Sequence, residues 1–448
     1  MRRLELSLFL ATNLALFGCA SLQAVNTPLE KIDRESGYRP FAQLKDRSPG
    51  NIWLTLAFSG GGTRAAAFAY GVLEELRDTV VHVDGKSIRL LDEVDTISAV
   101  SGGSFPAAYY GLFGDRIFDD FEEKFLNRNI QRALILRALR PWNTLRLLSP
   151  SYTRSMLALD FYNREVFDKK TFADLAASDG PHIHINATDL SHGYRFTFNQ
   201  GQFDVICSDL DVLPVATAVA ASSAVPLLLS PITLKNYAGR CGYELPPWIG
   251  DALESPGSDR RRFMSGQSFF DFMDSTKRPY IHLLDGGIAD NLGLRFAIEL
   301  MAAAGGINSL IEAIGVTPPS QFVVIVVNAE TDPNPAIDLS SAAPSFAALM
   351  ASVSGSQIRR YNLETLLLAE ESIRTFGNAL APSVAEPVEA RLIEVSFDSI
   401  PHEEERSYFK LLPTSFELTD DTVANLRAAG RKLLRENPEF RELLQNLQ

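Results

Sequence analysis

Residues 90–113 read LLDEVDTISAVSGGSFPAAYYGLF, and this stretch decides the fold. An apolar segment typical of a buried strand ends at Ser101, and after two glycines the sequence continues in the pattern of a helix. Residues 51–76, which read NIWLTLAFSGGGTRAAAFAYGVLEEL, repeat this plan of strand, glycine turn and helix. Two such units in succession predict an α/β fold, in which helices cover a mainly parallel sheet.

Composition argues against two common classes of protein. The chain has 448 residues, is 46% apolar and carries a formal net charge of −13, so it can bury a substantial core. So acidic a chain is a poor candidate for general nucleic-acid binding. The sequence also lacks a Cys/His cluster with the spacing of a zinc site.

Ser101 is the candidate nucleophile. A serine on a sharp strand-to-helix turn needs small residues two positions before and two positions after it, because the backbones of strand and helix come close there. Of the three serines between residues 98 and 104, only Ser101 meets this condition, with Ala99 and Gly103 at those positions. The alternative is a serine that caps the following helix and has no chemical role.

Gly60, Gly61 and Gly62, in SGGGTR at 59–64, are the candidate oxyanion hole. Three consecutive glycines let backbone N–H groups turn to one side at a helix N-terminus, where the helix dipole also favours negative charge. In acyl transfer this charge is the tetrahedral oxyanion. A phosphate site is disfavoured because the G-x-x-x-x-G-K-[ST] spacing is absent, and a simple turn would not need three glycines.

Asp285 ends an apolar strand in LLDGGIADN at 283–291, and two glycines follow it. An aspartate at the carboxyl end of a strand in an open α/β sheet faces the crevice where ligands bind. A Ser–Asp–His triad would need a histidine after the acid, and the only one, His402, stands far away in a polar stretch. A Ser101–Asp285 dyad with Asp285 as the general base is therefore the simpler prediction, and Asp290 is assigned to capping.

Together these motifs resemble the patatin-like phospholipase family, whose pattern is G-G-G-x-[RK], then G-x-S-x-G, then D-G-[GA]. Two further blocks agree: 185–198 is similar to the central strand pair of the family, and 220–231 is similar to the helix that leads to its A-x-P segment. The resemblance covers about residues 51–300, with Ala99 as its one clear departure. It implies a three-layer α/β/α fold and hydrolysis of acyl esters in phospholipids or lysophospholipids, without a metal or an organic cofactor.

The resemblance also implies roles for single residues. Ser101 would be the nucleophile, Asp285 the base and the Gly60–Gly62 amides the oxyanion hole, while Arg64 would pack or pair beside that loop in a structural or a direct role. Two alternatives remain open. One is a catalytically idle lipid-binding or scaffolding lipoprotein, and the other is a thioesterase or protease that uses the same dyad.

The first residues have the form of a bacterial lipoprotein signal. Arg2 and Arg3 precede an apolar run, and LFGC at 16–19 resembles the lipobox, in which the signal is cleaved before a cysteine that is then acylated. Residues 1–18 are thus the predicted signal peptide and Cys19 is the predicted lipid anchor. No aspartate follows Cys19, which predicts the outer membrane by resemblance to enteric lipoproteins. A secretory signal with an incidental cysteine is the alternative.

The remaining chain is divided by composition. Residues 19–50 are expected to form a tether, 51–330 the catalytic domain and 331–448 a C-terminal extension packed on that domain. Cys207 and Cys241 are the other two cysteines of the mature chain. An oxidising compartment would favour a disulfide between them, and burial of two free thiols is the alternative.

One segment differs from the rest of the chain in charge. NRNIQRALILRALRPWNTLR at 127–146 holds five arginines and no acidic residue. Its arginines, Trp142 and its aliphatic residues suit docking on an anionic membrane. A helical wheel, however, scatters the arginines over about half the circumference, which leaves the apolar face poorly defined. A helix packed on the body, with its arginines paired to acids elsewhere, is the alternative.

Overall fold

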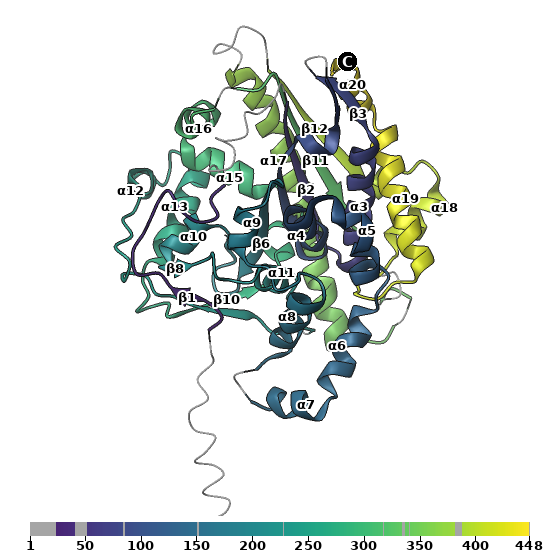
Figure 1. The fold of residues 1–448 in the computed structure, drawn as a ribbon, viewed down its shortest axis with the longest axis horizontal. Helices are drawn as coiled ribbons and strands as arrows, with labels where there is room; N and C mark the ends of the chain where they lie inside the picture. Colours follow the sequence, from purple (N-terminus) through teal and green to yellow (C-terminus); the bar gives the residue numbers. More distant parts are fainter. Residues whose placement is uncertain are drawn as a thin grey trace, which may run out of the picture.

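The computed structural model describes most of the chain, and its elements carry the labels of Figure 1. The described residues are 24–40, 52–83, 86–149, 152–226, 228–316, 318–333, 337–339, 341–380 and 388–447. Residues 1–18 and Cys19, predicted as signal peptide and lipid anchor, lie outside them. Among the described residues no single helix is long and apolar enough to cross a membrane. The bent pair α15 (Arg295–Ala304) and α16 (Ile307–Ile314) meets that test together, by length and composition alone.

A central sheet of eight strands forms the middle layer (Figure 1). Its order is β12-β11-β2-β5-β6-β10-β9, and β7 pairs with β6. The strands are β2 (Ile52–Phe58), β5 (Val94–Val100), β6 (His182–Asp189), β7 (Arg195–Thr197), β9 (Ile232–Lys235), β10 (Tyr280–Leu284), β11 (Gln321–Asn328) and β12 (Glu389–Ser396). The first five strands in this order are parallel, and β10 and β9 follow antiparallel. The predicted α/β fold with a mainly parallel sheet is confirmed.

The strands of the sheet serve two cores, because successive side chains in a strand point to opposite faces. In β2, Leu54, Leu56 and Phe58 enter one core, while Trp53 and Ala57 enter the other. Both faces of the strand are therefore apolar, as expected for a sheet that helices cover on both sides.

Helices on both faces complete the three layers. The first face carries α3 (Gly62–Asp78), α4 (Ser104–Phe113) and α19 (Asp420–Glu436), and the second carries α15, α16 and α17 (Phe346–Leu380) (Figure 1). Other elements are β3 (Val80–Val83), β4 (Lys86–Arg89), α5 (Ile117–Phe121), α6 (Ile130–Ala138), α7 (Pro141–Leu147), α8 (Arg154–Glu165), α9 (Phe172–Ala176), α10 (Gln200–Val205), α11 (Val215–Ser222), α12 (Pro247–Glu254), α13 (Arg260–Phe272), α14 (Gly287–Asp290), α18 (Glu403–Lys410) and α20 (Pro438–Asn446).

Residues 331–448, expected as a C-terminal extension packed on the catalytic domain, continue its sheet and its helical layers. β12 pairs with β11 along its whole length, and α17 and α19 belong to the layers on opposite faces of the sheet. The backbones of α19 and α3 come so close that a Cβ on Gly71 would lie 2.2 Å from the carbonyl oxygen of Arg427. Arg427 also forms an ion pair with Glu74 of α3 at 2.8 Å. Residues 331–448 therefore supply an edge strand and outer helices to one α/β unit.

The described part of the predicted tether is folded against the body. β1 (Thr27–Pro28) pairs with β8 (Ser208–Asp209), and Tyr38 is buried, with its ring stacked on His182 at a centroid distance of 4.1 Å. This corrects the tether expected over 19–50, because residues 24–40 belong to the fold. Their contacts include a two-residue strand pairing and a buried aromatic side chain, which composition does not reveal.

Cys207 and Cys241 form a disulfide beside this N-terminal segment. The N–H of Leu29 donates to the carbonyl oxygen of Cys207 at 2.7 Å, and that of Ile32 donates to Cys241 at 3.4 Å. A disulfide and two free thiols were the alternatives left open by the sequence, and the structure has the disulfide. Both cysteines also bind the N-terminal segment through their carbonyl oxygens.

Candidate functional site

Ser101 lies at the turn between β5 and α4. Its φ is +48°, a left-handed conformation that is strained for a residue with a side chain. The turn is closely packed, because a Cβ on Gly102 would lie only 2.1 Å from the carbonyl oxygen of Gly62. Glycine is therefore required after the serine, and the sharp strand-to-helix turn expected at Ser101 is present.

Ala99 does not disturb this turn, although the resembling pattern has glycine there. It is fully buried in β5, opposite Phe58 of β2 and Ile185 of β6. Its carbonyl oxygen accepts a hydrogen bond from Asn186 Nδ2 at 3.3 Å. The left-handed turn forms two residues later, so one methyl group in the strand is compatible with it.

The two neighbouring serines have other partners. Ser98 lines a cavity against the second helical layer, and its hydroxyl accepts a hydrogen bond from Asn186 Nδ2 at 3.0 Å. The Ser104 hydroxyl donates back to the carbonyl oxygen of Ser101 in the first turn of α4. Of the three serines, Ser101 is the one whose hydroxyl is hydrogen-bonded to Asp285.

Asp285 lies within hydrogen-bond distance of Ser101 although 184 residues separate them. The Ser101 hydroxyl donates to Asp285 Oδ2 at 2.8 Å, and the N–H of Gly287 donates to Oδ1 at 2.8 Å. Burial raises the pKa of Asp285 to about 6, while the two hydrogen bonds favour the charged form. At neutral pH the group is thus a carboxylate that can accept a proton from the serine.

The strand before Asp285 approaches the site from an unexpected direction. Asp285 was expected at the carboxyl end of a strand in an open α/β sheet, and its strand β10 is antiparallel to β6, with Leu284 opposite Thr188. β6 extends beyond β5, whose last residue Val100 pairs with Asn186. The carboxyl end of β10 therefore returns to the level at which β5 ends, and this brings Asp285 to the serine.

Ser222, the last residue of α11, supports the turn, and sequence reasoning missed it. The N–H of Ser101 donates to Ser222 Oγ at 2.8 Å, and that hydroxyl donates to the carbonyl oxygen of Asn186 at 2.6 Å. One hydroxyl thus ties the turn to β6. The only signal in the sequence was the resemblance of block 220–231, which marked the segment without marking the residue.

The same segment also holds the loop that carries the acid. The N–H of Asp285 donates to the carbonyl oxygen of Ala224 at 3.1 Å, and the N–H of Gly286 donates to that of Ser222 at 3.0 Å. After the loop, Asp290 accepts from the N–H of Arg295, the first residue of α15, at 2.8 Å. The end of α11 therefore positions both members of the pair.

The glycine loop offers two amide groups rather than three. The N–H of Gly60 donates to the carbonyl oxygen of Asn291 at 3.0 Å. Gly61 is the N-cap of α3 and Gly62 is its first residue, and neither N–H donates to a described residue. Of the three glycines expected to form an oxyanion hole, Gly60 is thus engaged elsewhere. Gly61 and Gly62 remain at the positive end of the helix dipole.

Arg64 binds distant parts of the chain. Its guanidinium donates to the carbonyl oxygens of Ala329 at 3.0 Å and Leu412 at 2.8 Å, and to the hydroxyl of Thr414 at 3.2 Å. Burial lowers its pKa to about 10. These contacts favour the structural role for Arg64, because they hold the glycine loop against the end of β11 and residues 412–414.

A cavity of about 210 Å³ opens over the pair. Its walls include Gly61, Ser101, Pro226, Asp285, Ile288 and Ile358. Polar residues such as Asn291, Glu330 and Arg359 line it together with aliphatic ones, a mixture that suits an ester with an apolar tail.

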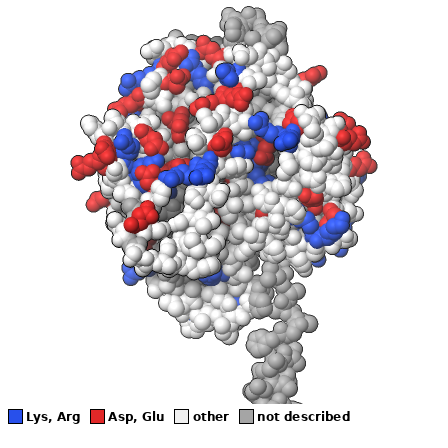
Figure 2. Space-filling model, turned by 180° about the vertical axis from the view of Figure 1, so that it is seen from behind, with Lys and Arg blue, Asp and Glu red and all other residues white. Residues whose placement is uncertain are grey.

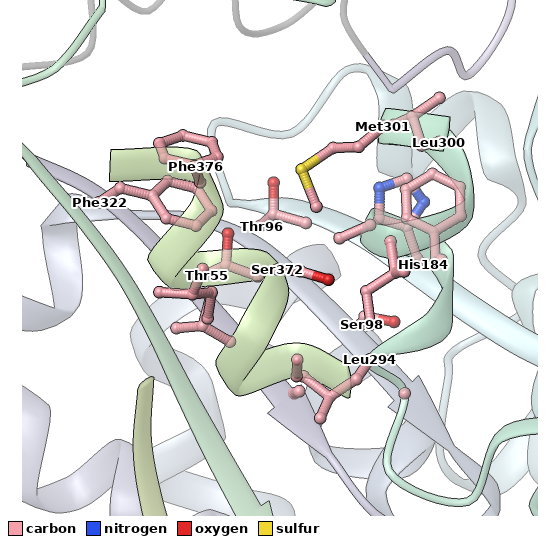
Figure 3. A pocket seen from close by; sticks show the side chains of 18 of the residues that line it. Thr55, Thr96, Ser98, His184, Leu294, Leu300, Met301, Phe322, Ser372 and Phe376 are labelled. Carbon is pink, nitrogen blue, oxygen red and sulfur yellow. The ribbon is translucent and has the colours of Figure 1, made fainter. Parts of the chain in front are cut away.

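A second cavity, of about 90 Å³, lies between the sheet and the layer of α15 to α17 (Figure 3). Thr55, Ser98 and His184 face it from the sheet, and Met301 and Phe376 face it from the helices (Figure 3). Its lining is largely apolar, holds no Asp, Glu, Lys or Arg, and shares no residue with the cavity over the serine. The chemistry of the candidate site therefore belongs to the first cavity.

Four of the described histidines, His182, His184, His192 and His282, have partners other than Ser101 and Asp285. His182 and His184 are buried among aromatic rings, and burial lowers the pKa of His182 to about 3. His282 bonds to Thr233 at 2.9 Å, and His402 precedes α18. Within the described ranges, no group of His, Cys, Asp and Glu has the arrangement of a metal site.

Comparison with known proteins agrees with the resemblance found in the motifs. The family model described as patatin-like phospholipase matches residues 56–298, which is more than half of the chain. No curated protein sequence matches it.

Solved structures with a similar course of the chain include two of human GIVD cytosolic phospholipase A2. The first has 13% identity and a TM-score of 0.48, and covers 96% of this chain and 68% of that one. The second, a complex with methyl gamma-linolenyl fluorophosphonate, has 13% identity and a TM-score of 0.44, and covers 96% and 66%. VipD from Legionella pneumophila has 12% identity and a TM-score of 0.28, and covers 93% and 73%.

Proposed function

The chain belongs to the patatin-like phospholipase family, and from this premise we propose that it hydrolyses acyl esters of phospholipids or lysophospholipids with a Ser101–Asp285 dyad. The observation that carries the proposal is the 2.8 Å hydrogen bond from the Ser101 hydroxyl to Asp285 Oδ2 at the wall of a cavity. Acyl transfer needs a nucleophile, a base in direct contact with it, and N–H groups nearby that can bind the oxyanion.

The proposed reaction has two halves. Asp285 takes the hydroxyl proton as Ser101 Oγ attacks the ester carbonyl carbon, and the N–H groups of Gly61 and Gly62 bind the resulting oxyanion. When the ester C–O bond breaks, the leaving alcohol takes the proton from Asp285 and the acyl group stays on Ser101. Water then attacks the acyl-serine, passes one proton through Asp285 to the departing Oγ, and releases the fatty acid.

Hydrolysis of a p-nitrophenyl ester tests the dyad. Ser101→Ala and Asp285→Ala should each remove most activity, and the double variant should lose no more than either, because both residues act in one step. His402→Ala is the control and should be fully active. Equal damage from His402→Ala would indicate a triad, and an inactive wild-type protein would favour the idle lipid-binding alternative. Product profiling on lipids, thioesters and peptides separates the hydrolase from a thioesterase or a protease.

We further propose that acylated Cys19 anchors the protein in the bacterial envelope, at the outer membrane. The lipobox-like sequence supports this, and the described chain begins five residues later at Ala24. Five extended residues reach at most about 18 Å, so an anchored cysteine would keep the folded body close to the bilayer. Cys19→Ser should abolish incorporation of a labelled fatty acid and release the protein from membranes, and unchanged labelling would refute the anchor.

A further inference from the structure

We propose that the hairpin of α6 and α7, residues 130–148, docks the protein on an anionic phospholipid bilayer beside the cavity that holds Ser101. Apolar side chains concentrate on the outer surface of this hairpin: Ile135, Leu136, Leu139, Trp142, Leu145 and Leu148. Trp142 is 70% exposed and Leu148 is 75% exposed. Single exposed apolar residues are ordinary, but a contiguous group of them marks an interaction surface.

The break between the two helices explains why the sequence pattern was ambiguous. A wheel for one continuous helix spreads the arginines and leaves no clear apolar face. In the structure α6 ends at Ala138, and α7 begins at Pro141, whose ring suits the first position of a helix. The chain turns between them, so the apolar residues of two short helices share one projecting element (Figure 1).

The five arginines of the segment divide into two groups. Arg128 and Arg137 both pair with Glu165 of α8, and Arg146 lies 3.7 Å from Asp160. These three arginines hold the hairpin on the body, as expected for a helix whose arginines pair with acids elsewhere in the chain. Arg132 and Arg140 are exposed, and neither forms an ion pair with a described residue.

Arg132 and Arg140 thus set unpaired positive charge among the apolar side chains. No Asp or Glu occurs anywhere in residues 127–148. This is the composition of a surface for anionic lipid head groups, in which guanidinium groups meet phosphates and apolar groups enter the interface.

The segments on both sides of the hairpin are bonded to residues near the walls of the Ser101 cavity. At the start, the N–H of Ile130 donates to the carbonyl oxygen of Phe416 at 3.1 Å, two residues from the wall residue Thr414. After the hairpin, the hydroxyl of Ser155 in α8 donates to the carbonyl oxygen of Ser230, four residues beyond the wall residue Pro226. A bilayer that meets the hairpin therefore lies next to the mouth of the cavity.

The beginning of α17 adds a second group of exposed apolar side chains beside the cavity. Phe346, Leu349, Met350 and Val353 are exposed, and the following turns of the helix line the cavity. Charged side chains gather over the upper part of the face shown in Figure 2, while its lower end is largely free of them. That lower end is where α7 lies in Figure 1.

A membrane fits this surface better than a second protein does. A chain with a net charge of −13 repels an anionic bilayer elsewhere, so its unpaired arginines favour one orientation. In that orientation the mouth of the cavity faces the lipid, which is where the proposed function would find its substrate. The docking itself does not depend on hydrolysis, and the two proposals can therefore fail separately.

Vesicle binding tests the docking surface. The protein is the chain from Ala20 onward, which keeps every described residue but lacks the predicted anchor, with Ser101→Ala to prevent hydrolysis. Sedimentation with phosphatidylcholine vesicles that contain phosphatidylglycerol should show binding that falls with salt. Arg132→Gln with Arg140→Gln should weaken it about 30-fold at low salt, since each arginine near an anionic surface contributes about a factor of five.

Matched controls locate the effect. Arg260→Gln with Arg374→Gln removes the same charge at exposed positions on α13 and late in α17, and should change binding less than about threefold. Tryptophan emission should shift to shorter wavelength on vesicle binding, and the shift should vanish in Trp142→Phe. Equal binding by the two double variants, or an unaltered shift in Trp142→Phe, would overturn the proposal. So would a wild-type protein that ignores vesicles and forms a dimer through this hairpin.

With Ser101 restored, the Arg132→Gln and Arg140→Gln variant should hydrolyse a soluble ester at the wild-type rate. A wild-type protein that binds vesicles without hydrolysing any ester would refute the proposed function and leave the docking surface intact.

Discussion

Replacing Ser222 with alanine removes one hydroxyl that serves two backbone groups at the site. It accepts from the N–H of Ser101 at 2.8 Å and donates to the carbonyl oxygen of Asn186 at 2.6 Å. All three residues are buried, so the variant leaves a donor and an acceptor without these partners. An unpaired buried polar group costs about 1–3 kcal/mol, and we expect the free energy of unfolding to fall by about 2 kcal/mol.

The larger effect is expected on catalysis. Ser101 is held at a φ of +48°, which is strained, and the hydrogen bond from its N–H to Ser222 is one of the contacts that maintain this conformation. Without that bond the turn can relax and carry the hydroxyl away from Asp285. A displacement of about 1 Å at a reacting group costs about 100-fold in rate, and we expect kcat/KM to fall by this order.

Ser223→Ala is the matched control for this prediction. The Ser223 hydroxyl donates to the carbonyl oxygen of Val219 within α11 at 2.7 Å, so the Ser101 turn does not use it. Both variants are compared with the wild type by urea unfolding and by hydrolysis of a p-nitrophenyl ester. If Ser222→Ala retains as much activity as Ser223→Ala, Ser222 does not position the serine and the reasoning is refuted.

Three further predictions concern the acid, the turn and the disulfide. Because burial raises the pKa of Asp285 to about 6, kcat/KM should be constant above that pH and fall about tenfold for each unit below it; a profile that stays flat to pH 4 would exclude Asp285 as the base. Gly102→Ala should lose at least about 100-fold in kcat/KM, because its Cβ would lie 2.1 Å from a backbone oxygen, whereas Gly250→Ala, which meets nothing within 4 Å, should be neutral. Cys207→Ser with Cys241→Ser should lower the free energy of unfolding by about 3 kcal/mol in urea titrations and leave ester hydrolysis unchanged; equal stability would show that the disulfide does not form.

The predictable parts of the fold are those that depend on short-range sequence patterns. A strand, a glycine turn and a helix follow each other at Gly60–Gly62 and again at Ser101, and each junction needs small residues for steric reasons. Parallel pairing of β2 and β5 follows from two such units in succession. The candidate serine and acid were identified for the same reason, since each stands next to glycines at the end of an apolar run.

The parts that could not be predicted depend on contacts between distant segments. Nothing local shows that β10 is antiparallel, and Asp285 reaches the serine only because β6 extends beyond β5. Ser222 carries no sequence signal that distinguishes it from Ser223, because its role depends on which way a hydroxyl at the end of α11 points. The pairing of β12 with β11, which adds a strand from the C-terminal extension to the sheet, is equally non-local.

The buried acid permits a final prediction, because it costs the folded state stability. A pKa of about 6 in place of the ordinary 3.8 corresponds to about 3 kcal/mol that favours the protonated form in the fold. The Asp285 carboxyl group loses its proton near pH 4 in the unfolded chain and near pH 6 in the folded chain. The stability of the fold is therefore highest below pH 4 and decreases as the pH rises through 6.

Asp285→Asn removes the charge but keeps the shape of the side chain. It should therefore raise the free energy of unfolding at pH 8 by up to about 3 kcal/mol, and should differ little from wild type at pH 4, while ester hydrolysis is lost. Urea unfolding at the two pH values measures both effects, and a variant destabilised at pH 8 would mean that the carboxylate stabilises the fold. A residue that weakens the fold and is needed for turnover is explained by the reaction rather than by packing.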